Sequence, residues 1–276
     1  MKIKYLGTAA YEGVPAPYCE CAVCKRSRET GGRAVRTRSQ ALIDGVLLID
    51  FNADTYCHSL RYFIDWSQIG DCLITHSHSD HLYPADLEML SEPYSHRHKT
   101  LHFYAAQSGF EKIKAEEDKH GAASNISVSL VEPGKPFAVA DGAYTVLPLR
   151  ANHDENSSPV FYAIRRGEKR MLYAHDTGVF FEEVYEQLKT FGRLDLVSLD
   201  CTGCLGHGWD WRNGHMSLKT NLEVLARLQE EGIVDAGTTV VANHFSHNGG
   251  QTYDEMVPVM AKRGIIVSYD GLEIEF

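Results

Sequence analysis

The sequence lacks any long hydrophobic run. The apolar runs GVLLID and DCLIT are short, and nothing approaches the ~18 consecutive apolar residues that a membrane helix needs. The N-terminus, MKIKYLG, carries basic residues but no apolar segment of the kind that a secretory signal contains. We therefore expect no membrane association and, by default, a cytoplasmic protein.

Positive charge is also scarce, since 27 lysines and arginines face 37 acidic residues and the formal net charge is −10. Non-specific nucleic-acid binding depends on broad positive potential, so the composition argues against nucleic acid as a partner. Residues 25–38 are the exception, because their bases are opposed only by Glu29. This stretch is either a solvated loop or a positive lip for an anionic substrate, and its best candidates for substrate binding are Arg36 and Arg38.

The seven cysteines are an odd number, which does not suit a disulfide framework. Reduced thiols and metal ligands are the better interpretation. Cys19, Cys21 and Cys24 form a C-x-C-x-x-C loop that could clamp one Zn²⁺, but a closed structural site takes four ligands. We expect His247 to be the fourth ligand. The alternative is a loop of free thiols, which would be prone to oxidation.

A second cysteine pair lies in DCTGCLGHGWDW, residues 200–211. Cys201 and Cys204 form C-x-x-C with His207 nearby, so a further zinc site is conceivable but lacks a fourth ligand. We favour a loop of free thiols that lines a substrate pocket, in which Trp209 and Trp211 stack on a sugar or a base.

Short apolar runs rich in β-branched residues alternate with amphipathic segments of helical length. No linker divides the chain, which predicts one domain over residues 1–276. In FYAIRRGEKRMLYA two strands turn at Gly167 and are expected to be antiparallel, which disfavours a purely parallel sheet and favours a mixed, layered α/β domain. We expect strands near residues 2–6, 40–44, 46–50, 71–75, 100–104, 126–131, 143–149, 159–165, 169–174, 195–199, 238–242, 264–268 and 272–276, and helices near 53–65, 84–91, 107–118, 179–190, 217–231 and 252–262.

Residues 75–82, THSHSDHL, crowd together His76, His78, Asp80 and His81. They follow the strand expected at 71–75, and a loop at the end of a strand is rigidly held yet accessible. His76 and His78 are two residues apart and share one side of an extended segment. Asp80 and His81 come after the chain begins to turn and can face a second ion. Imidazole and carboxylate suit Zn, Mn or Fe without any thiolate.

The motif His-x-His-x-Asp-His after an apolar strand resembles the signature of the metallo-β-lactamase superfamily. The resemblance implies an αββα sandwich, in which two mixed sheets are flanked by helices and a dinuclear metal site lies at one edge. It also implies later ligands in the order His, Asp, His. Candidates that follow expected strands stand in that order: His153 in LRANHDE, Asp176 in LYAHDTG and His244 in VVANHFSH.

The resemblance also implies which residues share an ion. The first ion would bind His76, His78 and His153, and the second ion would bind Asp80, His81 and His244. Asp176 would bridge the two ions, and Asp80 would also have a catalytic role. His175 is expected to pack beside the site rather than bind metal. Asp50, which ends GVLLID, resembles the superfamily's aspartate beside the site and would orient a ligand histidine by accepting its distal N–H.

Further motifs narrow the resemblance. The cysteine loop, RTRSQALI, the histidine cluster, H-x-x-H and the closing SYDGLEIEF are together similar to the PhnP-like phosphoribosyl cyclic phosphodiesterase branch, and PqqB-like proteins carry a similar cysteine loop. In the PhnP-like branch a histidine at the position of His215 lies near the substrate. His215 could protonate the leaving alkoxide or hold a phosphate oxygen; the alternative is a helix-capping histidine without a catalytic role.

These motifs predict a metal-dependent phosphodiesterase that hydrolyses a small, anionic cyclic phosphate or similar diester with a metal-bridging hydroxide. One alternative is a lactone, thioester or β-lactam hydrolase on the same dinuclear site, and another is a non-catalytic PqqB-like metal-binding protein. The expected cofactors are two divalent ions, Zn or Mn, at the catalytic site and one structural Zn. The substrate, the native metal and the oligomeric state stay open, although a homodimer would be unsurprising.

Overall fold

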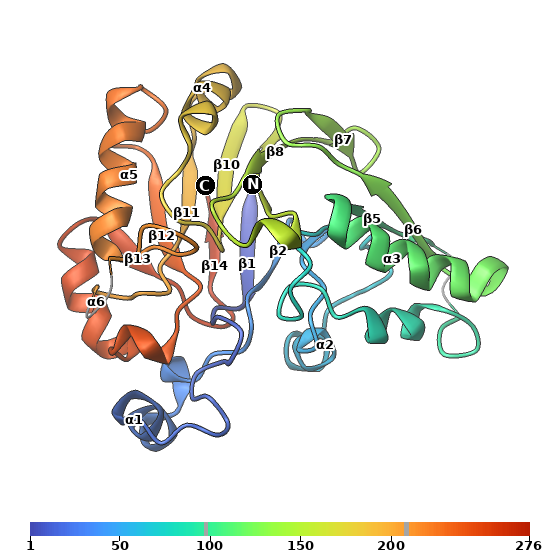
Figure 1. Ribbon diagram of the computed structural model, residues 1–276, viewed down its shortest axis with the longest axis horizontal. Coiled ribbons are helices and arrows are strands. Elements are labelled where there is room, and N and C mark those ends of the chain that lie inside the picture. Colours follow the sequence, from blue (N-terminus) through green and yellow to red (C-terminus); the bar gives the residue numbers. More distant parts are fainter. Residues whose placement is uncertain (97–98, 207–209) are drawn as a thin grey trace.

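Two β-sheets lie face to face at the centre of the computed structural model, which describes residues 1–96, 99–206 and 210–276 (Figure 1). The first sheet has the strand order β14 (Glu273–Glu275), β1 (Lys2–Gly7), β2 (Gln40–Ile43), β3 (Leu47–Ile49), β4 (Asp71–Leu73), β5 (Leu101–Ala105) and β6 (Ile126–Leu130). The second sheet has the order β13 (Ile265–Val267), β12 (Thr239–Asn243), β11 (Leu196–Asp200), β10 (Lys169–Ala174), β9 (Val160–Arg166), β8 (Tyr144–Arg150) and β7 (Phe137–Val139).

Both sheets are mixed. Strands β14 to β3 pair antiparallel and β3 to β6 pair parallel. In the second sheet β7 to β10 pair antiparallel and β10 to β13 pair parallel. The predicted hairpin is strands β9 and β10, and it turns at Gly167, whose φ of 56° a residue without Cβ adopts readily.

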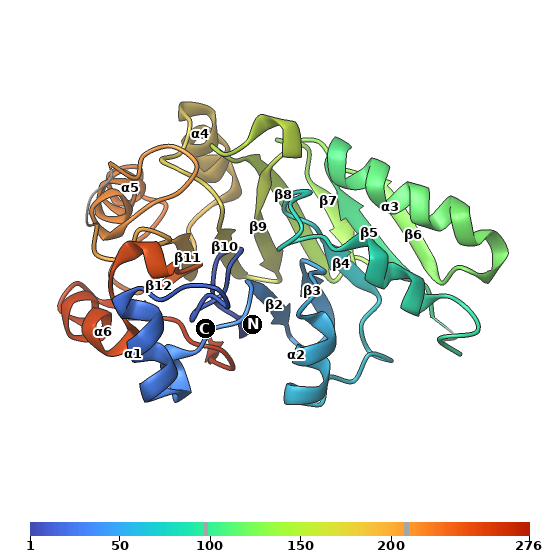
Figure 2. The same ribbon diagram turned by 60° about the horizontal axis from the view of Figure 1, so that its bottom comes forward.

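Helices cover the outer face of each sheet and complete an αββα sandwich, as predicted (Figures 1 and 2). Helices α2 and α3 lie over the first sheet, and α4, α5 and α6 lie over the second. Helix α1 lies beside α6, to which it is joined by an ion pair of 3.2 Å between Arg26 and Glu255. The helical elements are α1 (Ala22–Thr30), α2 (Thr55–Tyr62), α3 (Gln107–His120), α4 (Glu182–Phe191), α5 (Leu218–Glu230), α6 (Tyr253–Ala261) and the 3-10 segments η1 (Gly32–Ala34), η2 (Pro84–Leu90), η3 (Gly121–Ala123), η4 (Glu155–Ser157) and η5 (His247–Gly249).

Alternating side chains along each strand fill two different layers. In β3, Leu47 and Ile49 enter the core between the sheets, whereas Leu48 packs on the outer side with Ile113 of α3. Successive strand residues point to opposite faces, and both faces of this sheet are covered. A continuous apolar run such as GVLLID therefore forms a buried strand. Such runs are typical of parallel sheets, but β3 pairs antiparallel with β2 and parallel with β4.

Apart from the three-residue 3-10 segments, three elements of the described residues differ from the predictions. Helix α1 was not predicted, because AVCKRSRET has few apolar residues and no clear apolar stripe. Strand β7 was not predicted either, and it has only three residues. Residues 84–90 are helical, but as a 3-10 helix that begins at Pro84.

The carboxyl ends of several strands meet at one edge of the sandwich. His76 follows β4, His153 follows β8, Asp176 follows β10 and His244 follows β12. Because β10, β11 and β12 are adjacent and parallel, the residues after these strands are neighbours in space while lying far apart in the sequence. This edge therefore gathers the predicted metal ligands.

His58 on α2 is a buried histidine away from that edge. Its Nδ1 lies 2.6 Å from Gln40 Oε1, and its Nε2 lies 2.7 Å from Thr37 Oγ1. Burial lowers the pKa of His58 to about 4, an effect that Asp54 opposes only in part. The unfolded chain, with an imidazole pKa near ~6.5, binds this proton more readily than the folded protein does.

We expect His58 to make the protein less stable as the pH falls. Stability that is present above pH ~6.5 is lost progressively down to about pH 4, by an amount on the order of 3 kcal/mol. Urea unfolding of wild type and His58→Gln at several pH values measures this loss, and the difference between the two proteins should change only below pH ~6.5. A difference that stays constant from pH ~7 to pH ~4 would contradict the assignment.

Within the described residues, no helix is both long enough and apolar enough to cross a membrane.

Candidate metal centre

Three histidines form the first cluster at the sheet edge. His76 Nε2 lies 3.0 Å from His78 Nδ1, which lies 3.3 Å from His153 Nε2. One nitrogen from each ring is within 4.8 Å of the others, which is the arrangement needed to hold one ion. The structure thus brings together the three side chains predicted to share the first metal.

The remaining nitrogens of these rings have other partners. His153 Nδ1 lies 3.0 Å from the carbonyl oxygen of Gly214 and donates to it, which leaves Nε2 with a free lone pair. His78 has the opposite ring orientation. Its Nε2 lies 3.2 Å from Asp154 Oδ2, and its Nδ1 faces His76 and His153. Such partners fix the tautomer and orientation of a metal-binding histidine.

The second cluster consists of Asp80, His81, Asp176 and His244, all of which are buried. Asp176 Oδ2 lies 2.6 Å from His81 Nε2 and 2.8 Å from His244 Nε2. The other oxygen, Oδ1, lies 3.7 Å from His153 Nε2 in the first cluster. Asp176 therefore faces both clusters, one oxygen to each, as a bridging ligand must.

Buried polar atoms in the second cluster test whether a cation fits there. His81 Nε2, His244 Nε2 and Asp176 Oδ2 are all buried, and none makes a hydrogen bond of acceptable geometry. Unsatisfied buried polar atoms are costly and rare, and these three point at one another. Nitrogen and carboxylate donors of this kind suit Zn, Mn or Fe. The donor set therefore fits a divalent ion.

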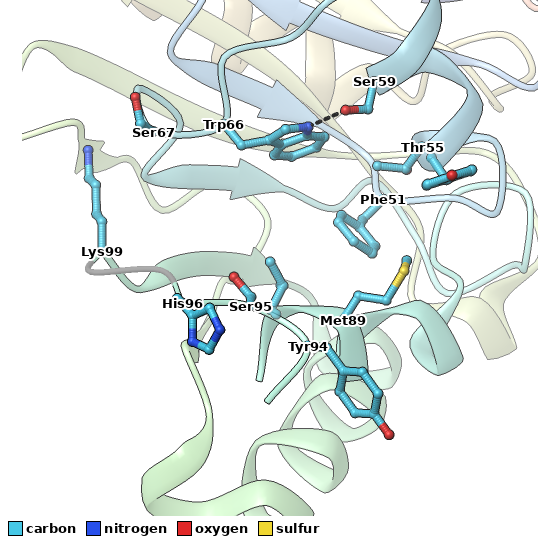
Figure 3. A pocket seen from close by; sticks show the side chains of 12 residues that line it. Phe51, Thr55, Ser59, Trp66, Ser67, Met89, Tyr94, Ser95, His96 and Lys99 are labelled. Carbon is cyan, nitrogen blue, oxygen red and sulfur yellow. Dashed lines mark hydrogen bonds between the residues drawn. The ribbon is translucent and has the colours of Figure 1, made fainter. Parts of the chain in front are cut away.

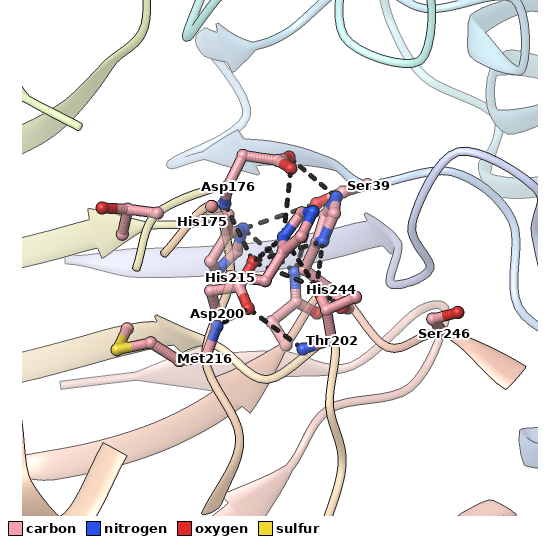
Figure 4. Close-up of polar contacts among 12 residues, drawn as sticks. Ser39, His175, Asp176, Asp200, Thr202, His215, Met216, His244 and Ser246 are labelled. Carbon is pink, nitrogen blue, oxygen red and sulfur yellow. Dashed lines mark hydrogen bonds and ion pairs between the residues drawn. The ribbon is translucent and has the colours of Figure 1, made fainter. Parts of the chain in front are cut away.

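Carboxylates behind the clusters hold the ligand rings. Asp50 Oδ2 lies 2.7 Å from His81 Nδ1, as expected from its place at the end of β3. Asp200, at the end of β11, lies behind His244 and His215 (Figure 4). Its Oδ2 is 3.0 Å from His215 Nδ1 and 3.4 Å from His244 Nδ1, and it also accepts from the Asp176 N–H at 3.1 Å.

The sequence analysis missed Asp200, although a signal was present. LVSLD ends a buried strand in aspartate, just as GVLLID does at Asp50. Thr202 was also missed, and its hydroxyl lies 2.9 Å from His244 Nδ1 and 3.1 Å from His215 Nδ1. His175 packs as predicted, with its Nε2 2.8 Å from Ser198 Oγ.

Two aspartates and one histidine of the site have unusual backbone angles. Asp50, Asp176 and His244 have φ values of 68°, 52° and 63°. Residues other than glycine rarely adopt this left-handed region, and it concentrates at functional sites. Each of the three lies just after the end of a strand, where the turn aims its side chain into the site.

The two clusters differ in electrostatics. Burial, assisted by the nearby His81, lowers the pKa of His76 well below its usual value, and burial also lowers the pKa of His153. Burial likewise disfavours charge on His244, but Asp176 and Asp200 outweigh it and raise its pKa to about 10. Carboxylates thus favour positive charge in the second cluster, where a metal ion competes with protons for the same lone pairs.

A cavity of about 460 Å³ opens over both clusters. Its floor is formed by residues of the two clusters and by His215: His78, Asp80, His153, Asp176, His215 and His244. Tyr11, Glu12, Trp211, Ser246 and Asn248 are among the other residues that line it. Trp211 therefore reaches the predicted substrate pocket, whereas His207 and Trp209 lie outside the described residues. Cys201 and Cys204 are buried, and burial raises the pKa of both thiols, so they stay protonated.

The cysteine loop lies beside His247, its expected fourth ligand. Cys19 Sγ and Cys21 Sγ lie 3.6 and 3.4 Å from His247 Nδ1, and these atoms and Cys24 Sγ are mutually within 4.8 Å. Burial disfavours the Cys21 thiolate, but the Cys24 N–H and His247 outweigh this effect and lower the pKa of Cys21 to about 6. Three sulfurs and one imidazole fit a closed zinc site.

The two candidate substrate-binding arginines lie elsewhere. Arg36 is only 4% exposed, and its guanidinium donates to Thr8 Oγ1 and to the Ser268 carbonyl, each at 2.7 Å. This burial corrects the expectation that Arg36 belongs to an exposed lip. Arg38 pairs with Asp54 at 3.1 Å and donates to the carbonyl of Tyr11 at 2.8 Å. It supports the cavity wall from behind and does not line the cavity.

A larger cavity of about 640 Å³ lies between α2 and η2 (Figure 3). Phe51, Trp66 and Met89 line it, and Trp66 Nε1 donates to Ser59 Oγ at 2.7 Å. It is mainly apolar, and among the described residues no member of the two sheet-edge clusters or of the cysteine-loop site lies in its wall. Size alone therefore does not identify the functional site of this protein.

Comparisons with known proteins agree with this geometry. A family described as "Beta-lactamase superfamily domain" matches residues 64–245. The chain is 28% identical over 284 residues to an octanoyltransferase of Porphyromonas gingivalis, in a match that covers 99% of this chain and 51% of that protein. The chain thus spans about half the length of this curated relative.

Two solved structures share the whole fold. Zn²⁺-bound PqqB from Methylobacterium extorquens superposes with a TM-score of 0.77 at 20% identity, covering 100% of both chains. A diphosphatase from the PhnP family superposes with a TM-score of 0.73 at 23% identity, covering 100% of this chain and 97% of that chain. These similarities confirm the predicted sandwich.

Proposed function

This chain belongs to the beta-lactamase superfamily, and on that basis we propose that it is a metal-dependent hydrolase of a small phosphodiester, such as a cyclic phosphate. The position of Asp176 is the main support for this proposal, because its two carboxylate oxygens face two separate groups of ligands. His76, His78 and His153 would hold one ion, and Asp80, His81 and His244 the other. When bound, two such ions lower the pKa of bound water toward ~7 and neutralise charge on a phosphoryl oxygen.

His215 would act as the general acid. Its Nδ1 is held by Asp200 at 3.0 Å, which leaves Nε2 for a substrate in the cavity that His215 lines. Burial disfavours the charged ring, but Asp200 outweighs burial and raises the pKa of His215 above that of an ordinary histidine. The protonated ring would donate to the leaving oxygen, a contribution worth about 10²- to 10⁴-fold.

One of the structural relatives supports phosphate chemistry, because the PhnP-family protein is a diphosphatase. Within the described residues the cavity lining contains neither lysine nor arginine. Under this proposal the two ions, rather than a basic lip, would supply the positive charge that binds the phosphate. A compact cavity with two metal ions at its floor would suit a small anionic substrate.

Acyl hydrolysis is the second candidate function. The relative from Porphyromonas gingivalis is named for octanoyl transfer, and this chain matches half of its length. A lining without lysine or arginine among the described residues would also suit a neutral ester, thioester or lactone. His215 would then donate to a leaving alkoxide or thiolate in the same position.

Substrate preference distinguishes these candidates. Protein reconstituted with Mn²⁺ or Zn²⁺ is assayed with bis(p-nitrophenyl) phosphate, a lactone and a thioester under one set of conditions. We expect the phosphodiester to be cleaved with the highest kcat/KM and the activity to vanish in His78→Ala. Higher kcat/KM for the thioester or lactone would establish the acyl function instead. Absence of all three activities in fully metal-loaded protein would favour a non-catalytic metal-binding role.

A further inference from the structure

Glu12 lies between the two candidate metal sites. Its Oε1 accepts a hydrogen bond from Ser246 Oγ and lies 3.4 Å from His247 Nε2. The Glu12 side chain is 26% exposed, and Glu12 lines the cavity above the dinuclear centre. One carboxylate thus lies beside the histidine of the cysteine site and also forms part of the substrate cavity wall.

The segment that carries His247 is held in place from both sides. The Phe245 N–H donates to the Thr8 carbonyl at 2.9 Å, and the Phe245 carbonyl accepts from the Ala10 N–H at 3.0 Å. Thr8 and Ala10 come shortly before Glu12 in the chain. The Ser246 hydroxyl also accepts from the Asn248 N–H at 3.0 Å and caps η5. Since His244 and His247 are three residues apart, this short segment reaches both metal sites.

The His247 ring has a distinct role for each nitrogen. Nδ1 faces the sulfurs of Cys19 and Cys21, so Nδ1 is the atom that a zinc ion would take. Nε2 must then carry the proton, and Glu12 is the acceptor within reach. A carboxylate in this position fixes the tautomer of a zinc-binding histidine and raises its basicity.

We propose that Glu12 is a positioning residue that couples the cysteine-loop zinc site to the substrate cavity. It holds His247 toward the zinc ion, and the zinc-bound His247 in turn holds Glu12 at the cavity wall. Coupling of this kind is reciprocal: loss of zinc from the loop loosens the His247 contact of Glu12, so that the Ser246 hydrogen bond alone holds Oε1 less firmly, and loss of Glu12 weakens zinc binding. The zinc-binding half of the proposal does not rest on the phosphodiesterase function.

Cobalt provides a test that needs no activity. Co²⁺ replaces Zn²⁺ in the loop, where sulfur ligands give a thiolate-to-cobalt charge-transfer band that the dinuclear N/O site cannot give. A chelator is added, and decay of the band is followed in wild type, Glu12→Ala, Glu12→Gln and the control Glu20→Gln. Glu20 is an exposed acid of the same loop. We expect about 10-fold faster loss in Glu12→Ala, a smaller change in Glu12→Gln and none in Glu20→Gln.

The reciprocal effect is tested by a double-mutant cycle. Cys21→Ser weakens the loop site, and its effect on KM for bis(p-nitrophenyl) phosphate is measured with Glu12 present and with Glu12→Ala. We expect Cys21→Ser to shift KM by about threefold or more, with little change in kcat, only when Glu12 is present. Equal shifts in both backgrounds, or equal cobalt loss in wild type and Glu12→Ala, would overturn the proposal. Failure of all phosphodiester cleavage would count against the proposed function and leave the cobalt result decisive for Glu12.

Discussion

Asp176→Ala is expected to lower hydrolytic activity by at least about 10³-fold and to reduce bound metal from about three ions per chain toward one. Asp176 faces both ligand clusters, with Oδ2 2.8 Å from His244 Nε2 and Oδ1 3.7 Å from His153 Nε2. A metal pair supplies several kcal/mol of transition-state stabilisation, which corresponds to roughly three powers of ten in rate. The ion in the cysteine loop should remain, because Asp176 is not among the four ligands of that site.

Elemental analysis and initial rates on the same preparation measure both parts of this prediction. Asp176→Asn is the second variant, since it keeps the side-chain volume if alanine disturbs folding. Asp118→Ala is the matched control, because Asp118 is an exposed residue of α3 whose carboxylate forms an ion pair with Lys114, away from the metal clusters. Full metal content and activity in either Asp176 variant would refute the bridging role.

His215→Gln is expected to lower kcat by about 10²- to 10³-fold while the metal content stays unchanged. His215 Nδ1 lies 3.0 Å from Asp200 Oδ2 and 3.5 Å from Asp176 Oδ1. His215 lines the cavity, and neither ligand cluster needs it to be complete. Asp200 stabilises its imidazolium against the effect of burial, so the pKa of His215 lies above that of an ordinary histidine. An acid with a raised pKa keeps its proton to a higher pH than an ordinary histidine does, and it loses that proton as the pH rises further.

Two further measurements separate acid catalysis from a structural role of His215. In wild type kcat should fall as the pH rises above the raised pKa, and His215→Gln should lack this alkaline limb. A p-nitrophenolate leaving group needs little protonation, so the variant should lose less activity with a nitrophenyl diester than with an alkyl diester. An equal loss with both leaving groups, or an unchanged alkaline limb, would exclude the role of general acid.

Local sequence patterns predicted much of the fold and most of the candidate ligands. Short apolar runs rich in β-branched residues located every strand of the described residues except β7, and His-x-His-x-Asp-His located one group of candidate metal-binding side chains, because both are properties of consecutive residues. The resemblance to the metallo-β-lactamase superfamily implied later ligands in the order His, Asp, His, and His153, Asp176 and His244 fitted that order because each follows a strand. Helix α1 escaped prediction because its segment carries charge where an apolar stripe would be expected.

Other features of the site became visible only in three dimensions. Arg36 is basic and lies in a basic stretch, yet folding buries it over the ring of Phe245, with 4.3 Å between the guanidinium carbon and the ring centroid. Asp200 has no motif of its own and gains its role from the parallel pairing of β10, β11 and β12. Glu12 meets Ser246 and His247, which lie more than 200 residues further along the chain.

The amino-acid order by itself therefore determined the strand pattern, the family and the chemical types of the metal-binding groups. The tertiary structure decided which nitrogen of each imidazole faces a neighbour, which carboxylate faces both clusters and which charges are buried. The physical reason is that strands adjacent in a sheet can be distant in sequence, so the contacts at their carboxyl ends depend on strand order and register. Neither strand order nor register can be read from one segment alone.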